Sequence, residues 1–165
     1  MEPIVSIVMG SKSDLDIMSE AAKVLKEFGV PCEMRVISAH RTPDRAVEFG
    51  RAAKKRGVKI IIAGAGKAAH LPGVMAALTT IPVIGVPIET SDLGGLDSLL
   101  SIVQMPGGIP VATTAIGKHG ARNAGILAVE ILALSDPALG RRLEEYRSKM
   151  AAKVEEEDSS LRENA

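Results

Sequence analysis

Residues 4–14 read IVSIVMGSKSD, an apolar run followed by a short polar segment. The run from Ile4 to Met9 is nearly continuous, which is typical of a strand covered on both faces in a parallel sheet. From Ser13 onward, apolar residues recur at helical spacing until Gly29, where the helix is expected to end. The stretch therefore predicts a buried strand, a loop that begins at Gly10, and a helix.

The same order of strand and helix recurs along the rest of the chain. Further strands are predicted at residues 33–37, 59–63, 83–86 and 111–116, and further helices from 42 to a stop at Gly57 and at 71–80, 93–102 and 121–134. Five strands alternating with helices predict a parallel, doubly wound sheet with right-handed crossovers, similar to the flavodoxin-like arrangement. The expected fold class is α/β, a three-layer αβα sandwich, and 165 residues suit a single catalytic domain, residues 1–165.

One more helix is predicted after the sheet is complete. It begins at Asp136–Pro137 and carries an apolar stripe, formed by Leu139, Leu143, Tyr146, Met150 and Val154. The stripe either closes one face of its own domain or lies across a neighbouring subunit, so we expect a homo-oligomer larger than a dimer. The polar tail at 155–165 is expected to fray.

Composition restricts the classes of partner. Lys plus Arg and Asp plus Glu each total 20, and the chain has two Phe, one Tyr and no Trp, which argues against nucleic-acid binding. Cys32 is the single cysteine, so no intramolecular disulfide can form. The N-terminus lacks the pattern of a secretory signal, and no apolar run approaches the length of a membrane span. A small-molecule partner and a cytoplasmic location are expected.

The loop after the first strand has the features of a phosphate site. In a doubly wound sheet, ligands bind beyond the carboxyl ends of the strands. Gly10, Ser11 and Ser13 offer backbone N–H groups, hydroxyls and a helix N-terminus, although Ser13 alone would also suit a simple helix cap. Asp14, in the first turn, would suit ribose hydroxyls beside such a phosphate.

His40 and Arg41 follow the second predicted strand, just before the helix that starts at Pro43. Arg41 can bind a phosphate or carboxylate through two parallel hydrogen bonds. His40 has the side chain best suited to proton transfer near neutral pH. The pair therefore predicts a fixed cation beside a proton-transfer group.

The glycine-rich segment GAGKAA at 64–69 superficially matches a dinucleotide-binding fingerprint. The match follows the third strand instead of the first, and residue 84 is Ile where an acid would hold a ribose. We interpret the small residues as a surface that a flat ligand can approach closely. His70 then either contacts that ligand or serves as a cap or core residue, and His119 is placed in a solvated turn without a role. Three histidines in separate loops predict no metal site.

Four motifs together resemble one known family, the class I N5-carboxyaminoimidazole ribonucleotide mutases, which are the catalytic subunits of phosphoribosylaminoimidazole carboxylase (PurE family). The motifs are MGSKSD at 9–14, SAHRTP at 38–43, GAGKAAHLPG at 64–73 and SLLSIVQMPGGIPVAT at 98–113. The resemblance runs from about residue 4 to about residue 150. It implies a three-layer α/β fold, octamers with active sites at subunit boundaries, and no cofactor.

The resemblance also implies roles for individual residues. His40 would be the catalytic proton-transfer residue, and the substrate-binding residues would be Ser11, Ser13, Asp14, Ser38, Ala39, Arg41, Gly66, Ala69, His70 and Leu71. The implied reaction of purine biosynthesis moves a carboxyl group from the exocyclic nitrogen to ring C4 of the aminoimidazole, by decarboxylation and recarboxylation.

Two alternatives stay open. A class II-like carboxylase would use aminoimidazole ribonucleotide and free carbon dioxide, but the Arg–Ser pair expected in that class is absent after Gly66. A non-catalytic nucleotide-binding module would be supported only by the glycine-rich segment. Lys67 departs from the class I pattern, which often has Gly at this position.

Overall fold

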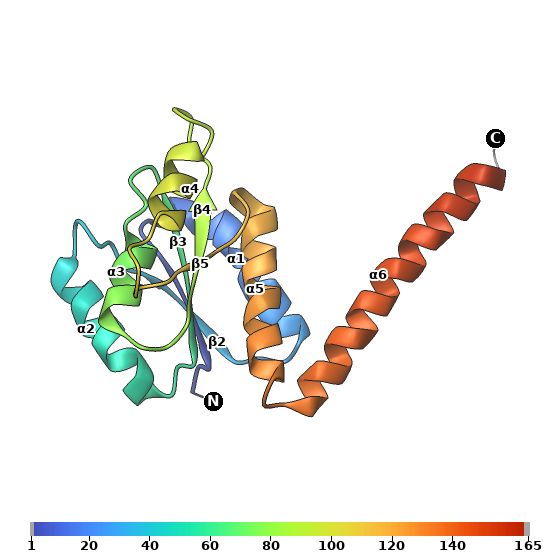
Figure 1. The fold of residues 1–165 in the computed structure, drawn as a ribbon, viewed down its shortest axis with the longest axis horizontal. Coiled ribbons are helices and arrows are strands. Elements are labelled where there is room, and N and C mark those ends of the chain that lie inside the picture. The colour runs from blue at the N-terminus through green and yellow to red at the C-terminus, as the bar shows by residue number, and fades with distance from the viewer. Residues whose placement is uncertain (1, 164–165) are drawn as a thin grey trace. The chain divides into compact units, whose positions relative to one another are not determined.

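The structure is a computed structural model that describes residues 2–163 of the chain. Figure 1 shows strands and helices alternating along the chain. The strands are β1 (Val5–Met9), β2 (Cys32–Val36), β3 (Ile60–Gly66), β4 (Val83–Ile88) and β5 (Ala112–Thr113). The α-helices are α1 (Leu15–Glu27), α2 (Pro43–Ala53), α3 (Leu71–Leu78), α4 (Leu96–Val103), α5 (Gly117–Ala133) and α6 (Pro137–Glu163), with 3₁₀ turns η1 (Lys12–Asp14) and η2 (Lys54–Arg56).

The strands form one five-stranded sheet in the order β2-β1-β3-β4-β5, and every pair is parallel. Val5 of β1 aligns with Cys32 of β2 on one side and with Ile60 of β3 on the other. The chain first extends the sheet from β1 to β2 and then returns to the opposite side of β1. This reversal between β1 and β3 is a topological switch point, where ligands bind beyond the carboxyl ends of the strands.

Helices cover both faces of the sheet, which confirms the predicted αβα sandwich. Figure 1 shows α2 and α3 on one side of the strands and α1 on the other. On the α2–α3 side, Phe49, Met75 and Ile102 pack in one buried cluster with Ile61 of β3. On the α1 side, α5 approaches so closely that a Cβ on Gly125 would lie 3.0 Å from the Val24 side chain. Small residues therefore bring these two helices together.

The strand–helix boundaries near the end of the sheet differ from the prediction. β5 has only two residues, against the predicted 111–116, and only Ala112 and Thr113 pair with β4. α4 starts at Leu96 instead of residue 93, since Gly94 and Gly95 adopt φ values of 59° and 87° in the turn before it. α5 starts at Gly117 instead of residue 121.

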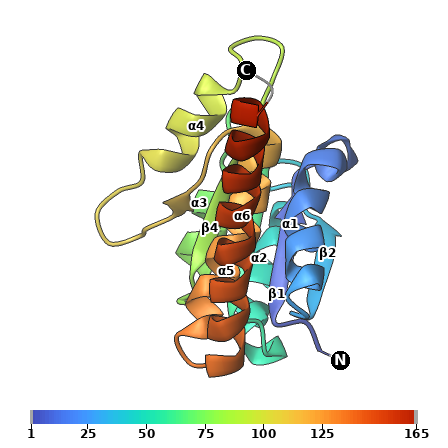
Figure 2. The same ribbon diagram turned by 90° about the vertical axis from the view of Figure 1, so that its right-hand side faces the viewer.

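The chain divides into two compact units, and the boundary falls after Ala128. In the second unit, Figure 2 shows α6 as one uninterrupted helix. An ion pair of 2.7 Å joins Arg147 to Glu130 in this unit. The prediction that the tail frays from residue 155 was wrong up to residue 163, because i,i+4 ion pairs such as Lys153–Glu157, at 3.7 Å, support the helix. Residues 164–165 lie outside the described residues.

Between residues 2 and 163, no helix is both long enough and apolar enough to cross a bilayer.

Candidate active site

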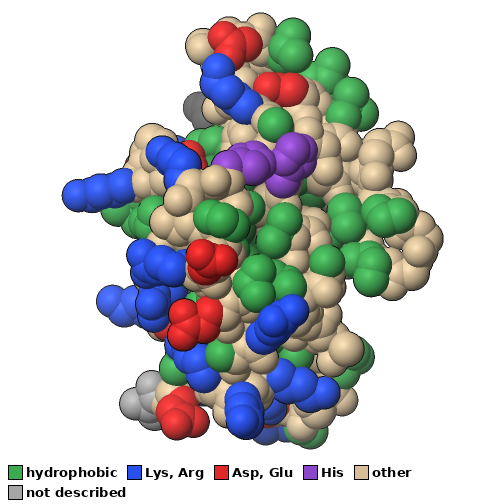
Figure 3. Space-filling model, turned by 90° about the vertical axis from the view of Figure 1, so that its left-hand side faces the viewer, with side chains coloured by type: hydrophobic (Ala, Val, Ile, Leu, Met, Phe, Trp, Pro, Cys, Tyr) green, Lys and Arg blue, Asp and Glu red, His purple; other side chains and the backbone are tan. Residues whose placement is uncertain are grey.

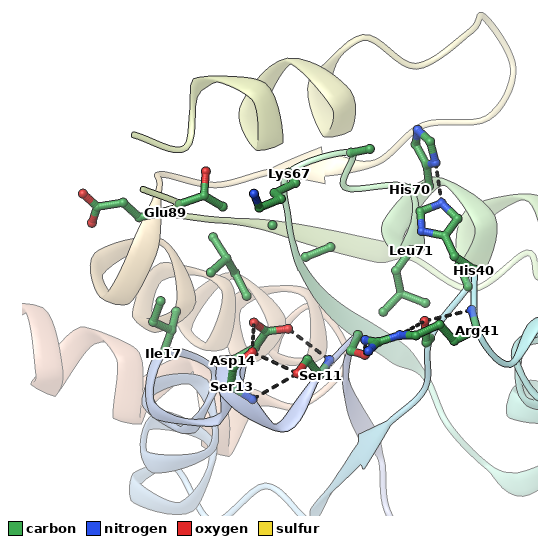
Figure 4. Close-up of a pocket in the computed structure, with 18 residues that line it drawn as sticks. Ser11, Ser13, Asp14, Ile17, His40, Arg41, Lys67, His70, Leu71 and Glu89 are labelled. Atoms are coloured by element: carbon green, nitrogen blue, oxygen red, sulfur yellow. Dashed lines mark hydrogen bonds between the residues drawn. The ribbon is translucent and has the colours of Figure 1, made fainter. Parts of the chain in front are cut away.

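A cavity of about 620 Å³ lies beyond the carboxyl ends of the strands, at the switch point of the sheet. Its lining comes from four segments within residues 10–17, 38–41, 65–71 and 88–90 (Figure 4). Among the predicted site residues, Ser11, Ser13, Asp14, Ser38, Ala39, His40, Arg41, Gly66, His70 and Leu71 line this cavity. The topology thus gathers side chains that are up to about sixty residues apart in sequence.

Ala69 is the exception among the predicted contacts. It is not among the residues that line the cavity, and it is only 1% exposed within the core cluster on the α2–α3 side. Its methyl group therefore packs in the core and not into the cavity. Ala65 and Ala68, which both precede it in the sequence, line the cavity instead.

The loop after β1 is held by a capping box. The Ser11 hydroxyl accepts a hydrogen bond from the Ser13 N–H at 3.3 Å, and the Asp14 carboxylate accepts one from the Ser11 N–H at 3.2 Å. The Ser13 hydroxyl in turn donates to the Ser11 hydroxyl at 2.9 Å. Ser11 is the N-cap of η1, and Asp14 occupies the N-cap position of α1, so the alternative that Ser13 only caps the helix is wrong.

Burial raises the pKa of the Asp14 carboxyl above its ordinary value. Hydrogen bonds from Ser13 and from the Ser11 backbone, together with the charge of Arg41, oppose that rise without cancelling it. A carboxylate in this position gains from additional donors, such as hydroxyl groups of a bound ligand.

Arg41 joins the loop after β2 to the loop after β1. Its Nη2 donates to the Gly10 carbonyl at 2.9 Å, and its Nε donates to the Ser38 hydroxyl at 3.3 Å. Thr42 fixes the same loop, because its hydroxyl accepts from the Ser38 N–H at 3.1 Å and donates to the Ser38 carbonyl at 2.9 Å. The guanidinium group is thus held at one wall of the cavity before any ligand binds. The positioning role of Thr42 was not predicted from the sequence.

His40 and His70 touch each other across the cavity edge. His40 Nε2 lies 2.7 Å from His70 Nδ1, and the two rings meet edge to face with centroids 4.9 Å apart. One of these nitrogens donates a hydrogen and the other accepts it, so the two imidazoles can share a proton. Figure 3 shows histidine side chains forming one patch on this exposed face. The contact between these two residues was not predicted from the sequence.

The contact also decides between the alternatives for His70. The residue occupies the N-cap position of α3, but its side chain makes no capping hydrogen bond. It is exposed and lines the cavity, so it is not a core residue. Of the readings left open by the sequence, cavity contact is the one that the geometry fits.

Several residues that line the cavity were not predicted from the sequence. Ile17 comes from α1, and Ile88, Glu89 and Thr90 come from the end of β4 and the loop after it. Position alone could have indicated the last three, because they follow a strand end just as the predicted residues do. A Cβ on Gly66 would lie only 3.1 Å from the Thr90 methyl group, so the small residue there keeps these two segments close.

Two regions outside the cavity lining also bear on the expected site. The loop at 104–108, which belongs to the fourth motif, contributes no lining residue to this cavity. His119 lies in the first turn of α5, and its neighbour Lys118 pairs with Asp16 at 2.7 Å, so this segment is helical and not a solvated turn. Over the described part of the chain, no three His, Cys, Asp or Glu side chains gather as a metal site would require.

Comparisons with known proteins agree with this geometry. The family model described as AIR carboxylase matches residues 4–153. An N5-carboxyaminoimidazole ribonucleotide mutase of Pyrococcus abyssi is 63% identical over 148 residues, covering 90% of this chain and 84% of that protein. The protein of the same name from Bacillus subtilis is 56% identical, covering 98% of this chain and 99% of its own. The crystal structure of Treponema denticola PurE superposes with a TM-score of 0.87 at 30% identity, covering 96% of this chain and 98% of that one. The chain therefore belongs to the AIR carboxylase family.

Proposed function

We propose that this protein is a 5-(carboxyamino)imidazole ribonucleotide mutase, an isomerase of purine biosynthesis. The observation that carries the proposal is the arrangement within one cavity: a hydrogen-bonded loop and a fixed arginine on one wall, and two touching imidazoles beside them. Curated relatives that are 55% and 63% identical carry the name of this mutase.

The wall formed by the Ser11–Asp14 loop, Ser38 and Arg41 suits the ribose phosphate. Ser11, Ser13 and Ser38 supply hydroxyls, and Arg41 supplies a permanent cation that is already oriented by Gly10 and Ser38. The partly buried Asp14 carboxylate is assigned to ribose hydroxyls, which would replace the water that it loses on burial. Preorganisation of this kind lowers the cost of ordering the site when the nucleotide binds.

Ala39 is assigned to the same wall as Ser38 and Arg41, and the flat imidazole is assigned to the part of the cavity lined by Gly66, His70 and Leu71. The absence of bulky side chains at residues 65–66 lets a planar ring approach the backbone of β3. Ala69, given as a direct contact by the sequence, is proposed to support this wall from behind, because it is buried in the core.

His40 is assigned to proton transfer, with His70 as its partner. In the proposed reaction, the carboxyl group leaves the exocyclic nitrogen as carbon dioxide, and that nitrogen gains a proton. Ring C4 then bonds to the carbon dioxide and loses its own proton. The reaction thus needs one proton delivered and one removed, which an imidazole pair at 2.7 Å can exchange. Positioning and exclusion of water supply the rest, and no cofactor is needed.

Both alternative functions have weaker support. A dinucleotide-binding module would need the glycines in the turn between a strand and a helix, but Gly64 and Gly66 lie within β3 itself. A class II-like carboxylase would use free carbon dioxide, whereas relatives that are 55% and 63% identical to this chain are named as mutases.

We also propose that the protein acts as a homo-octamer in the cytoplasm, with residues 1–165 as one catalytic domain. On α4, Leu96, Leu100 and Val103 follow helical spacing and are each about half exposed. On α6, Met150 and Val154 are exposed in the same way. Apolar faces of this kind favour a subunit interface. Light scattering that shows a stable monomer at micromolar concentration would contradict the assembly.

The decisive experiment is a substrate assay on the purified protein. We expect conversion of N5-carboxyaminoimidazole ribonucleotide to the C4-carboxylated isomer without metal, nucleoside triphosphate or added bicarbonate. Turnover that instead requires aminoimidazole ribonucleotide and free carbon dioxide would reassign the protein to the class II reaction. Absence of turnover with both substrates would overturn the enzyme proposal.

A further inference from the structure

Lys67 has an unusual backbone conformation at the cavity rim. It follows the last residue of β3, lines the cavity and has a φ of 56°. Throughout residues 2–163, it is the one residue other than glycine with a positive φ. This left-handed region is sparsely populated by residues with a Cβ. Backbone outliers of this kind cluster at functional sites, so a lysine at this position, where glycine would fit without strain, points to a role for its side chain.

The Lys67 ammonium group is held by an acidic partner from another loop. It forms an ion pair with the Asp92 carboxylate, which lies between β4 and α4. The two side chains are 67% and 58% exposed. Asp97, in the first turn of α4, is a second carboxylate whose charge acts on Lys67. Exposed ion pairs contribute little stability and exchange readily, so a ligand carboxylate can compete with Asp92.

The other cationic side chain at the cavity, Arg41, already has hydrogen-bond partners within the protein. Arg41 is tied to the Gly10 carbonyl and to the Ser38 hydroxyl on the wall of the Ser11–Asp14 loop. Figure 4 shows Lys67 across the cavity from that loop. A carboxylated ribonucleotide has two anionic groups, the phosphate and the carboxylate. The cavity correspondingly has two separate cations, and only Lys67 has a partner that a ligand carboxylate can replace.

We propose that Lys67 is a specificity-determining residue that binds the carboxylate of the carboxylated nucleotide, and that Asp92 holds its ammonium group until the ligand replaces it. This inference rests on the proposed function, because it names the part of that substrate which Lys67 recognises. Lys67 does not transfer protons and is not needed for the reaction itself. Its effect is selectivity for the carboxylated nucleotide over the uncarboxylated one.

A different role for the same ion pair makes a different prediction. If the pair were a mechanical latch between the two loops, removing either partner would weaken binding of every nucleotide. If Asp92 competes with the ligand for Lys67, the two replacements act in opposite directions. Removing Lys67 then weakens binding of the carboxylated nucleotide, and removing the Asp92 charge strengthens it.

The test is calorimetric titration of the full-length protein with two ligands that differ in one group. The probes are the C4-carboxylated aminoimidazole ribonucleotide and aminoimidazole ribonucleotide, which lacks the carboxylate. For Lys67→Met we expect affinity for the carboxylated ligand to fall roughly three- to tenfold at low salt. For Asp92→Asn we expect it to rise roughly two- to fivefold. Affinity for the uncarboxylated ligand should stay within about twofold in both variants, by the same energy scale.

Two further variants control for charge and for folding. Lys67→Arg keeps the cation and should retain selectivity for the carboxylated ligand, whereas Lys67→Gly, which fits the positive φ, should lose it as Lys67→Met does. Lys118→Met removes an exposed lysine whose ion pair with Asp16 lies outside the cavity lining, and it should change neither affinity. The effects at Lys67 and Asp92 should shrink as salt is raised.

The proposal is overturned if Lys67→Met and Asp92→Asn shift affinity in the same direction, if both ligands are affected equally, or if neither variant differs from wild type. In each of these cases the proposed function stands, provided that the wild-type protein still converts the carboxylated substrate. A wild-type protein that binds neither nucleotide would overturn the proposed function and this inference together.

Discussion

The two sides of the cavity are built in different ways. The wall of Ser11, Ser38 and Arg41 is fixed by hydrogen bonds among its own loops, including the capping box and the contact of Arg41 with the Gly10 carbonyl at 2.9 Å. The rim at Lys67 is exposed and joined to its neighbouring loop by an ion pair with Asp92. This difference suits the two sides of the cavity to different tasks. Under the proposed function, the fixed wall would bind the ribose phosphate that all candidate nucleotides share, and the exposed rim would distinguish between them.

Replacing His40 should have the largest effect, because it removes the chemistry while leaving the fixed wall intact. For His40→Asn we expect turnover to fall by about 10²- to 10⁴-fold. Nucleotide affinity should change by less than about 1.4 kcal/mol, a factor of ten. Steady-state kinetics together with calorimetry would measure the two quantities. Retention of more than about a tenth of wild-type turnover would contradict the proton-transfer role.

Breaking the fixed wall at Arg41 should affect binding more than turnover. Arg41→Ala removes a charge-assisted contact, and we expect nucleotide affinity to fall by about 10- to 100-fold, from roughly 1.5–3 kcal/mol for such a bond. Arg35→Ala is a matched control, since Arg35 is an exposed arginine of β2 that pairs with Glu33 and does not line the cavity. Equal losses of affinity in both variants would show that the effect is not specific to the wall.

Replacing Asp14 should affect nucleotide binding and protein stability in different ways. For Asp14→Asn we expect the Michaelis constant to rise severalfold, because the amide is a weaker acceptor for ribose hydroxyls. The pKa of Asp14 is raised by burial, so the folded state disfavours the charged carboxylate and loses stability as pH rises through that pKa. The variant should therefore be at least as thermally stable as wild type at pH 7, and any advantage should vanish as pH falls towards the ordinary value of 3.8. A clear loss of stability at pH 7, seen by calorimetry, would refute this account.

The smallest expected effect concerns the rim itself. Lys67→Gly should relieve the positive φ and raise the free energy of unfolding by about 1 kcal/mol, which corresponds to about 2–4 °C in Tm for a chain of this size. Lys67→Ala loses the same ammonium group but keeps a Cβ, so it should not be stabilised. Thermal unfolding of both variants side by side would test this difference. Equal Tm values would mean that the left-handed backbone costs nothing here.

Much of the fold follows from local sequence patterns. The apolar run at 4–9 and the predicted strand at 59–63 indicate buried central strands, and residues 5–9 and 60–63 are buried in the structure. The predictions from these patterns are wrong where a turn or a local side-chain interaction, and not the apolar periodicity, sets the end of an element. Gly94 and Gly95 form a turn with positive φ values, so α4 begins three residues later than its apolar pattern predicts. The tail after residue 155 was misjudged because its polar composition concealed i,i+4 ion pairs such as Lys153–Glu157.

The site residues could be predicted from the sequence where they directly follow a predicted strand. Residues such as Ser11, His40 and His70 follow strands, and the parallel topology brings them to one edge. Contacts between separate loops were not predictable in this way. Nothing in a one-dimensional pattern places His40 Nε2 at 2.7 Å from His70 Nδ1, or turns Ala69 into the core while Ala68 lines the cavity.

The left-handed backbone at residue 67 also has an evolutionary consequence. The loop holds a φ of 56° with a lysine in place, so its path does not depend on having glycine there. Side chains at this position can then be exchanged during evolution, within the residues that tolerate such a backbone, without rebuilding the loop or the wall of Ser11, Ser38 and Arg41. If Lys67 has the role proposed above, single substitutions here would change substrate preference while His40 and the opposite wall stay unchanged.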